Sequence, residues 1–287
     1  MTGIAFALFV LLNLSYASPA DAAGDPTRGE YIARLGGCRS CHTDPTKKDA
    51  PLAGGLELTS PIGTFHVPNI TPDRKTGIGG WSERDFIRAM TDGIAPDGSH
   101  YYPVFPFTSY KLMTVKDLLD LKAYLDTVRP VRNVVPPHRL HFPYSFRSLL
   151  RVWKWLFFRR ASFVPDAKKS ATWNRGAYLV TGPGHCGECH TARNFLGVSD
   201  SVHVLAGARK GPDGKRAPNI TPHPKDGIGL WSAQDIVRLL KTGELPYGET
   251  VDSPMDDVVT DSTSHWTDDD LKSVAEYLLS LPERKTP

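Results

Sequence analysis

The sequence is poor in several features that would otherwise define its structure. Only four of its 287 residues are cysteine, and only four are methionine. Its apolar runs are too short to cross a membrane, because a spanning helix needs about 20 predominantly apolar residues. It also lacks any extended stretch in which apolar and polar residues alternate, as they do in half-buried strands. We therefore expect a chain of helices and loops that does not span a membrane.

The four cysteines all lie in two copies of Cys-x-x-Cys-His, which is the attachment sequence of c-type haem. In such a site both thiols form thioethers to one haem, and the adjacent histidine is the proximal iron ligand. A zinc knuckle is the main alternative, but it needs four ligands and each motif supplies three. A redox-active thiol pair would not require the histidine. The predicted haem-binding residues are Cys38, Cys41 and His42 in the first motif and Cys186, Cys189 and His190 in the second.

The first 23 residues have the pattern of a secretory signal peptide. An apolar segment at Ile4–Leu14 is followed by small residues and a candidate cleavage site at Ala20–Ala23. No lysine or arginine precedes the apolar segment, which is unusual, and a buried helix of the mature fold is the alternative. Export agrees with covalent haem attachment, which occurs outside the bacterial cytoplasm. We expect a periplasmic protein that associates with the inner membrane.

The chain repeats itself at an interval of about 150 residues. Two copies are too few for a solenoid, so we predict two similar, mainly helical domains in tandem, residues 24–130 and 171–287. Ser followed by an acidic residue three positions later predicts a capped helix in the middle of each copy. The recurring segments are Arg28–Ile32 with Arg175–Leu179, Pro68–Pro72 with Pro218–Pro222, and Gly77–Ser82 with Gly227–Ser232.

A low-spin haem usually has a second axial ligand, and methionine is a common one. Met255 precedes the final helix of the second copy, so we predict it as the sixth ligand there; a methionine that only packs is the alternative. In the first copy Phe105 occupies about the same place, and phenylalanine cannot ligate iron. Met113 is the leading candidate for the first haem. An open or water-bound iron and ligation by His100 remain alternatives.

The repeated Asn-Ile-Thr-Pro and Trp-Ser segments carry hydrogen-bond donors that could contact haem propionates. Such outer bonds also tune the potential of the iron. Turn formation is an equally good explanation, because asparagine and proline are common in turns. The candidate propionate contacts are Asn69, Thr71 and Trp81 in the first copy and Asn219, Thr221 and Trp231 in the second.

Residues 131–170 have no counterpart in the repeat. They contain nine Lys or Arg and one acidic residue, so the rest of the chain carries 25 basic and 30 acidic residues (34 − 9 and 31 − 1). Within this connector, residues 148–160 mix aromatic and basic side chains. Such a helix could lie in a membrane interface, or it could pack between the domains as a connector or contact a partner. We expect no nucleic-acid binding from an exported haem protein.

These motifs together resemble the multihaem cytochrome c subunits of membrane-bound bacterial alcohol and sugar-acid dehydrogenases. The resemblance implies an all-α fold of two tandem class I cytochrome c-like haem domains joined by the basic aromatic connector. It also implies a periplasmic carrier that accepts electrons from a dehydrogenase and passes them to the quinone pool or a terminal oxidase. Those subunits resemble three such domains in series. Their first distal segment commonly reads Tyr-Pro-Ala-Met-Pro, where this chain has Val104 and Phe105 in place of Ala-Met.

Two classes of function therefore remain. The leading hypothesis is a non-catalytic dihaem electron carrier, in which the protein holds the haems and sets their potentials. The alternative is a dihaem oxidase or peroxidase-like enzyme with an open first haem. It remains a candidate because Phe105, which cannot ligate iron, occupies the place of Met255. A sensor is a weaker alternative, because no signalling domain is attached.

Overall fold

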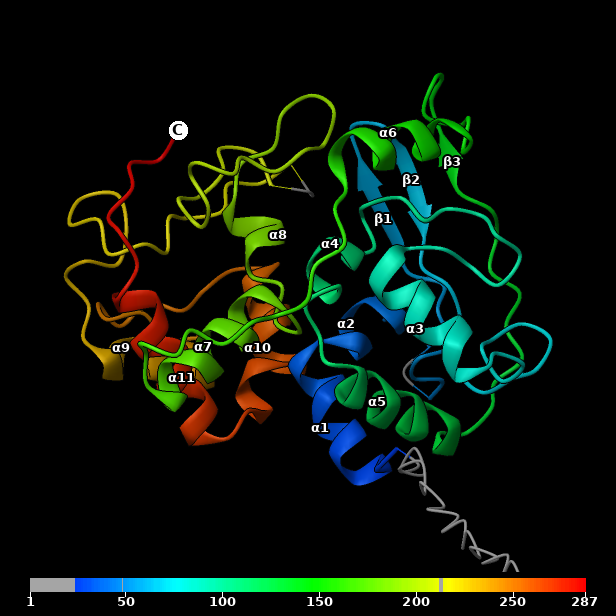
Figure 1. Cartoon of the computed structure of the whole chain (residues 1–287), viewed down its shortest axis with the longest axis horizontal. Helices are drawn as coiled ribbons and strands as arrows, with labels where there is room; N and C mark the ends of the chain where they lie inside the picture. Colours follow the sequence, from blue (N-terminus) through cyan, green and yellow to red (C-terminus); the bar gives the residue numbers. More distant parts are fainter. Residues whose placement is uncertain (1–23, 48, 212–213) are drawn as a thin grey trace, which may run out of the picture.

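The computed structural model describes residues 24–47, 49–211 and 214–287. The predicted signal peptide, residues 1–23, lies outside this range. The first half contains α1 (Pro26–Leu35), α2 (Cys38–His42), α3 (Glu83–Asp92), α4 (Phe107–Tyr110) and α5 (Val115–Thr127), and the connector contains α6 (Leu149–Phe157). The second half contains α7 (Ala171–Thr181), α8 (Gly187–His190), α9 (Ala233–Thr242), α10 (Met255–Asp261), the 3₁₀ helix Thr263–His265 and α11 (Asp268–Leu279) (Figure 1).

The sequence-predicted helix starts are confirmed at the middle helix of each half. Ser82 and Asp85 form a reciprocal capping box at the start of α3, and Ser232 and Asp235 do the same for α9. Both helices end at a glycine in the left-handed conformation, which suits a residue without a Cβ. The two halves therefore share the same local signals.

The all-α expectation is wrong in one respect, because the structure contains a small antiparallel sheet. Strands β1 (Glu57–Ser60) and β2 (Gly63–His66) form a hairpin, and β3 (Arg139–Leu140) from the connector pairs with β2. Strands of two to four residues are too short to show a clear alternating pattern. The partner that completes the sheet is also distant in sequence.

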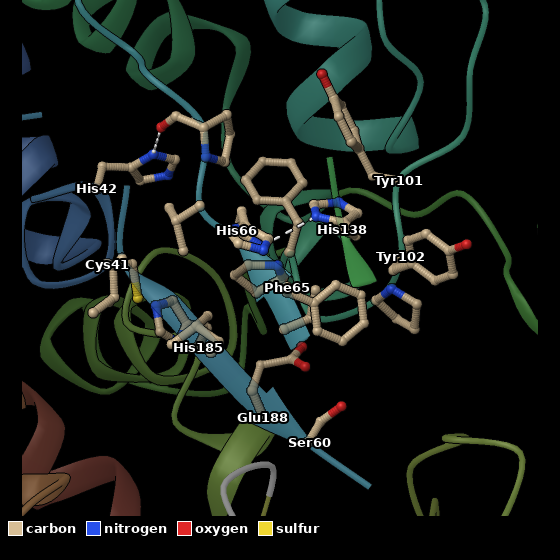
Figure 2. Close-up of a pocket in the computed structure, with 18 of the residues that line it drawn as sticks. Cys41, His42, Ser60, Phe65, His66, Tyr101, Tyr102, His138, His185 and Glu188 are labelled. Carbon is tan, nitrogen blue, oxygen red and sulfur yellow. Dashed lines mark hydrogen bonds between the residues drawn. The ribbon is translucent and has the colours of Figure 1, made fainter. Parts of the chain in front are cut away.

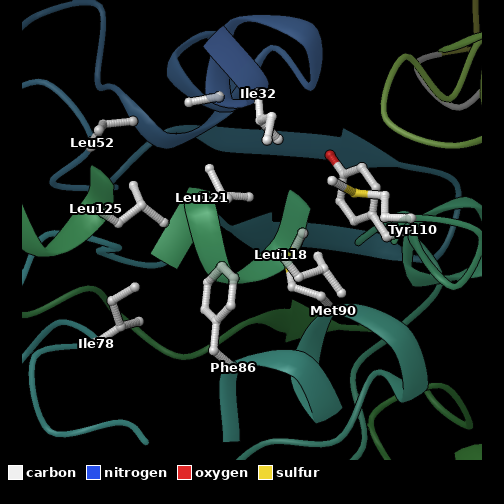
Figure 3. Packing of buried hydrophobic residues seen from close by; sticks show 11 residues of the cluster. Ile32, Leu52, Ile78, Phe86, Met90, Tyr110, Leu118, Leu121 and Leu125 are labelled. Atoms are coloured by element: carbon white, nitrogen blue, oxygen red, sulfur yellow. The ribbon is translucent and has the colours of Figure 1, made fainter. Parts of the chain in front are cut away.

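In each half the first and last helices cross with their backbones in contact, as Figure 1 shows for α1 and α5. A Cβ on Gly29 would lie 1.9 Å from the carbonyl oxygen of Asp120, and one on Gly176 would lie 1.9 Å from that of Ser273. Only glycine permits this approach. The α1–α5 crossing is part of the first-half core, which includes Ile32, Phe86, Leu118, Leu121 and Leu125 (Figure 3).

The two halves are joined by a reciprocal pair of tyrosine contacts. Tyr31 in α1 donates to Asp270 at 2.7 Å and accepts from the backbone N–H of Thr267 at 3.0 Å. Tyr178 in α7 donates to Asp117 and accepts from the backbone N–H of Thr114, which lies 3.2 Å away. Each tyrosine thus completes the N-terminus of the other half's last helix.

Each of these two aspartates, Asp117 and Asp270, also binds an arginine of its own half. Arg175 donates two bonds to Asp270, of 2.8 and 2.7 Å, and Arg28 pairs with Asp117 and Asp120. Burial raises the pKa of Asp270, but the bonds from Arg175 and Tyr31 outweigh it and bring the pKa below its ordinary value. In each Arg-Gly-x-Tyr motif the glycine therefore permits the helix crossing and the arginine binds the last helix of its own half. The tyrosine contacts the other half.

Replacing Gly29 with alanine should destabilise the protein by about 1–3 kcal/mol or more, since the new methyl group would overlap the backbone of α5. Gly80→Ala is the matched control, because a Cβ there would come no closer than 3.9 Å to the nearest surrounding atom, the carbonyl oxygen of Arg74. Thermal unfolding of the haem-loaded protein measures both. Equal unfolding temperatures for the two variants would contradict the crossing.

Asp270→Asn should destabilise the protein by about 1–3 kcal/mol, because charged hydrogen bonds to Arg175 and Tyr31 are lost. Since the folded-state pKa is depressed, this stabilisation is present above the ordinary aspartate pKa of about 3.9 and disappears as pH falls through the folded-state value. Denaturant unfolding between pH 7 and pH 3 should show a shallower acid dependence in the variant. Asp268→Asn, with a side chain 75% exposed, serves as the control and should have little effect.

Candidate haem-attachment sites

Both motif histidines are oriented in the same way by a proline carbonyl. Nδ1 of His42 lies 2.7 Å from the carbonyl oxygen of Pro68 (Figure 2). Nδ1 of His190 lies 2.7 Å from the carbonyl oxygen of Pro218. A carbonyl can only accept, so Nδ1 carries the proton and Nε2 keeps its lone pair. Burial lowers the pKa of both rings despite the opposing carbonyl bond, which favours the neutral form that ligates metals.

The loop after each motif returns in the same way in both halves. The carbonyl of His42 accepts from the N–H of Gly54 at 2.8 Å, and that of His190 accepts from the N–H of Gly207 at 2.8 Å. Both glycines have positive φ and lie against the backbone of the Pro-Asn pair in the same half, where a Cβ would collide. This loop holds the proline carbonyl in place beneath the histidine.

The first cysteine of each motif packs against the apolar core of its half, while Cys41 and Cys189 are exposed. In each motif the two cysteines are three residues apart on a short helix, so they share a face. Cys38 packs against the first core and Cys186 against the second, where Leu205, Ile228 and Trp231 are also found. Burial raises the pKa of Cys38 and of Cys186 to about 12.

A cavity of about 2180 Å³ adjoins the first motif. It is lined by Cys38, Cys41 and His42 together with apolar residues of the first core and the connector, and drug-sized ligands usually occupy only about 300–1,000 Å³. His66 from β2 also lines it; this ring is 5% exposed, and its Nε2 has no hydrogen-bond partner among the described residues. A polar group bound there would supply one. The cavity and the cysteine and histidine residues that line it therefore fit a haem. The sequence did not reveal His66, because the strand that carries it, β2, is too short to show a pattern.

The expected equivalence of Phe105 and Met255 agrees with the backbone register. Each lies five residues after the second member of an isolated bridge, and the two bridges are Ile94–His100 and Glu244–Thr250. Phe105 lines the cavity and packs edge-on against Tyr101 and Tyr110. Met255 is the first residue of the short helix α10, and its role as the sixth ligand stays a prediction.

The structure places the other predicted first-half ligand away from the cavity lining. Met113 is buried in the first core beside Tyr110, whereas Met90 both packs in that core and lines the cavity. His100 is close to Lys154 and Arg151, and it does not line this cavity. Ligation by Met113 stays a prediction that this core position does not support.

The Asn-Ile-Thr-Pro residues use their polar atoms inside the protein. Asn69 donates to the carbonyl of Val131 at 2.7 Å and accepts from the Thr71 hydroxyl at 2.7 Å. The corresponding second-half bonds join Asn219 to Arg284 at 2.7 Å and Thr221 to Asn219 at 2.7 Å. These four residues clamp the chain that leaves each half. Of the predicted propionate contacts, Asn69 and Trp81 line the cavity, and for all six residues the role stays a prediction.

The two attachment motifs lie close together at the boundary between the halves. His185, directly before Cys186, has Nε2 3.3 Å from the carbonyl oxygen of Gly36, two residues before Cys38. Its ring packs edge-on against Tyr110, with centroids 5.6 Å apart. Glu188 in the second motif accepts from two hydroxyls of the first half, Thr108 at 2.7 Å and Ser109 at 2.6 Å. Sequence patterns do not show these contacts between the halves, because they join residues 79 to 149 positions apart.

Comparison with known proteins agrees with this geometry. No protein-family model matches the chain. A dihaem cytochrome c-type protein of Cereibacter sphaeroides is 43% identical, with 92% of this chain and 88% of that protein covered. The cytochrome subunit of fructose dehydrogenase from Gluconobacter japonicus is 39% identical over 90% of this chain, and that of alcohol dehydrogenase (quinone) from Gluconobacter oxydans is 41% identical over 95%. The chain spans 53% and 58% of these two subunits. The chain belongs to the family of dihaem c-type cytochromes and dehydrogenase cytochrome c subunits.

Proposed function

We propose that the chain is a periplasmic electron carrier with two covalently bound haems, one in each of two tandem domains. The observation that carries the proposal is the duplicated proximal arrangement, in which His42 and His190 each lie 2.7 Å from a proline carbonyl oxygen. Two thiols adjoin each histidine on the same short segment. A bound haem supplies reversible one-electron chemistry at its iron.

The residues of each half would hold the group rather than react themselves. Cys38, Cys41 and His42 would fix the first haem, and the equivalent residues of the second motif would fix the second. The His–Pro bond sets the ring orientation and increases the basicity of Nε2, which is how an outer hydrogen bond tunes a metal ligand. His185 packs against Tyr110 between the two motifs, and its bond to the carbonyl of Gly36 would fix the position of one motif relative to the other.

The donor is proposed to be a partner dehydrogenase. The names of the relatives support this, since they are cytochrome subunits of fructose, alcohol and gluconate dehydrogenases. The acceptor would be the quinone pool or a terminal oxidase. Periplasmic location follows from the covalent chemistry proposed for the motifs and from the signal-like first 23 residues.

A second candidate function is an oxidase or peroxidase-like enzyme that reacts at the first haem. The observation that favours it is Phe105, which stands where the second half has Met255 and which lines the cavity beside His42. Met113 lies in the core beyond that lining. An iron held by His42 alone on the protein side would leave a coordination position for substrate.

The number of haems is tested by a pyridine haemochrome assay of the protein matured in a bacterial periplasm. The wild-type chain should contain two haems that remain attached after denaturation. Cys38→Ser/Cys41→Ser and Cys186→Ser/Cys189→Ser should each contain one, because each motif attaches one group. Zinc in place of haem in the purified wild-type protein would refute the proposal.

Carbon monoxide distinguishes the carrier from the enzyme. If both irons of the dithionite-reduced protein are firmly six-coordinate, the Soret band should not shift on titration. If half of the haem binds the gas and Met255→Ala raises that to all of it, the first site is open and the enzyme becomes the better description. Phe105→Met is the matched variant, because it conserves volume and should reduce carbon monoxide binding only where the first iron is open.

A further inference from the structure

Large apolar side chains are exposed on the connector and on a neighbouring loop of the second half. Phe142 is 81% exposed, Trp155 75% and Phe195 86%. Soluble monomers seldom expose apolar groups of this size in one place without a binding role. We call the set the apolar rim, and it consists of Phe142, Phe146, Leu149, Val152, Trp155, Leu156, Phe195 and Leu196.

The connector helix α6 buries one of its two cations, Lys154, and exposes Trp155 and Phe157, whereas an ordinary surface helix turns its apolar side inward. Lys154 is 7% exposed. Its Nζ donates to the carbonyls of Asp92 and Gly93 at 2.6 Å each, where α3 ends, and lies 4.4 Å from the ring centroid of Phe107. A cation at a helix C-terminus is stabilising. This contact fixes the rotation of α6 and turns its apolar side outward.

Further contacts hold α6 in this orientation from both ends. Arg160 forms two bonds of 2.6 Å with Asp92, and Lys111 donates to the carbonyl of Arg159 at 2.8 Å. The Trp153 indole donates to the carbonyl of Leu196 at 2.8 Å. This last bond joins the connector to the second-half loop, so the apolar rim is continuous across both parts.

Most of the apolar rim lines the cavity, and two of its residues lie beyond it. The lining residues are Phe146, Leu149, Val152, Leu156, Phe195 and Leu196, whereas Phe142 and Trp155 do not line the cavity. A group bound inside the cavity would therefore leave the last two uncovered. A surface that covers Phe142 and Trp155 must lie outside the cavity.

The charge of the connector indicates what kind of surface covers the apolar rim. The connector, residues 131–170, has nine basic residues and one acidic residue, while the rest of the chain has an excess of five acidic residues (30 − 25). An apolar strip with aromatic residues and flanking cations matches the interface of an anionic bilayer, where rings enter the headgroup region and cations meet phosphates.

We propose that the apolar rim docks the protein on an anionic lipid bilayer, with Trp155 and Phe142 inserted at headgroup depth and Lys154 as the positioning residue of α6. Among the described residues no helix has the length and apolar character to cross a membrane. The association is therefore peripheral. Because the cavity mouth lies within the rim, docking places the first attachment motif on the membrane side. The proposal does not depend on the number of haems.

The test is co-sedimentation of the intact haem-loaded protein with vesicles of phosphatidylcholine containing 0 or about 30% phosphatidylglycerol, the latter being a typical anionic content. The wild type should bind the anionic vesicles and release as salt is raised. Phe142→Glu/Trp155→Glu should bind at least about tenfold more weakly. The matched control is Leu230→Glu/Tyr247→Glu, whose side chains are 77% and 78% exposed outside the rim and should bind like the wild type.

A second measurement locates the insertion. Brominated phosphatidylglycerol should quench tryptophan fluorescence in the wild type, and Trp155→Phe should lose most of this quenching while keeping its absorption spectrum. Failure of the wild type to bind, equal binding to neutral vesicles, or equal loss in both double variants would overturn the proposal. The first of these outcomes would indicate that the rim meets a protein instead.

Discussion

The close crossing of two helices at a glycine is the constraint on which the rest of this structure depends. Where α1 meets α5 at Gly29 and α7 meets α11 at Gly176, the backbones touch, and no larger residue fits without displacement. The crossing fixes the direction of the first helix of each half. It thereby sets where the attachment motif begins, three residues after α1 ends, and where Tyr31 and Tyr178 can reach.

Against this shared frame, the two halves differ around their attachment motifs. The first half alone, among the described residues, has a hairpin and a sheet, and the connector helix packs on it through Lys154. The first half also has Phe105 at the position of Met255. The common elements orient the histidine of each motif, while the differences concern the residues that surround it. The two halves therefore share one way of holding the histidine and place it in two different environments.

How far the sequence predicts this arrangement depends on the range of each interaction. The capping boxes at Ser82 and Ser232 and the attachment motifs are local patterns, and the structure confirms the helices expected there. The bond from Tyr31 to Asp270 joins residues 239 apart, and no local pattern can reveal it. The inward turn of Lys154 was missed for a related reason, because a lysine in an amphipathic pattern is expected to face water. For Asn69 and Thr71 the sequence favoured propionate contact and turn formation equally, and their bonds to the carbonyl of Val131 were not predictable because that residue lies 60 or more positions away.

The reciprocal tyrosines also bear on how strong the contact between the halves has to be. Each half offers one phenol and one Asp–Thr pair, so the contact is self-complementary in the manner of a symmetric dimer. The connector links the two partners covalently, which keeps each at an effective concentration of about the millimolar range around the other. A contact too weak to hold two separate molecules together is then sufficient. Mutation can therefore alter one face of the pair without separating the halves, and the sequences of the two copies have been free to diverge while their pairing persists.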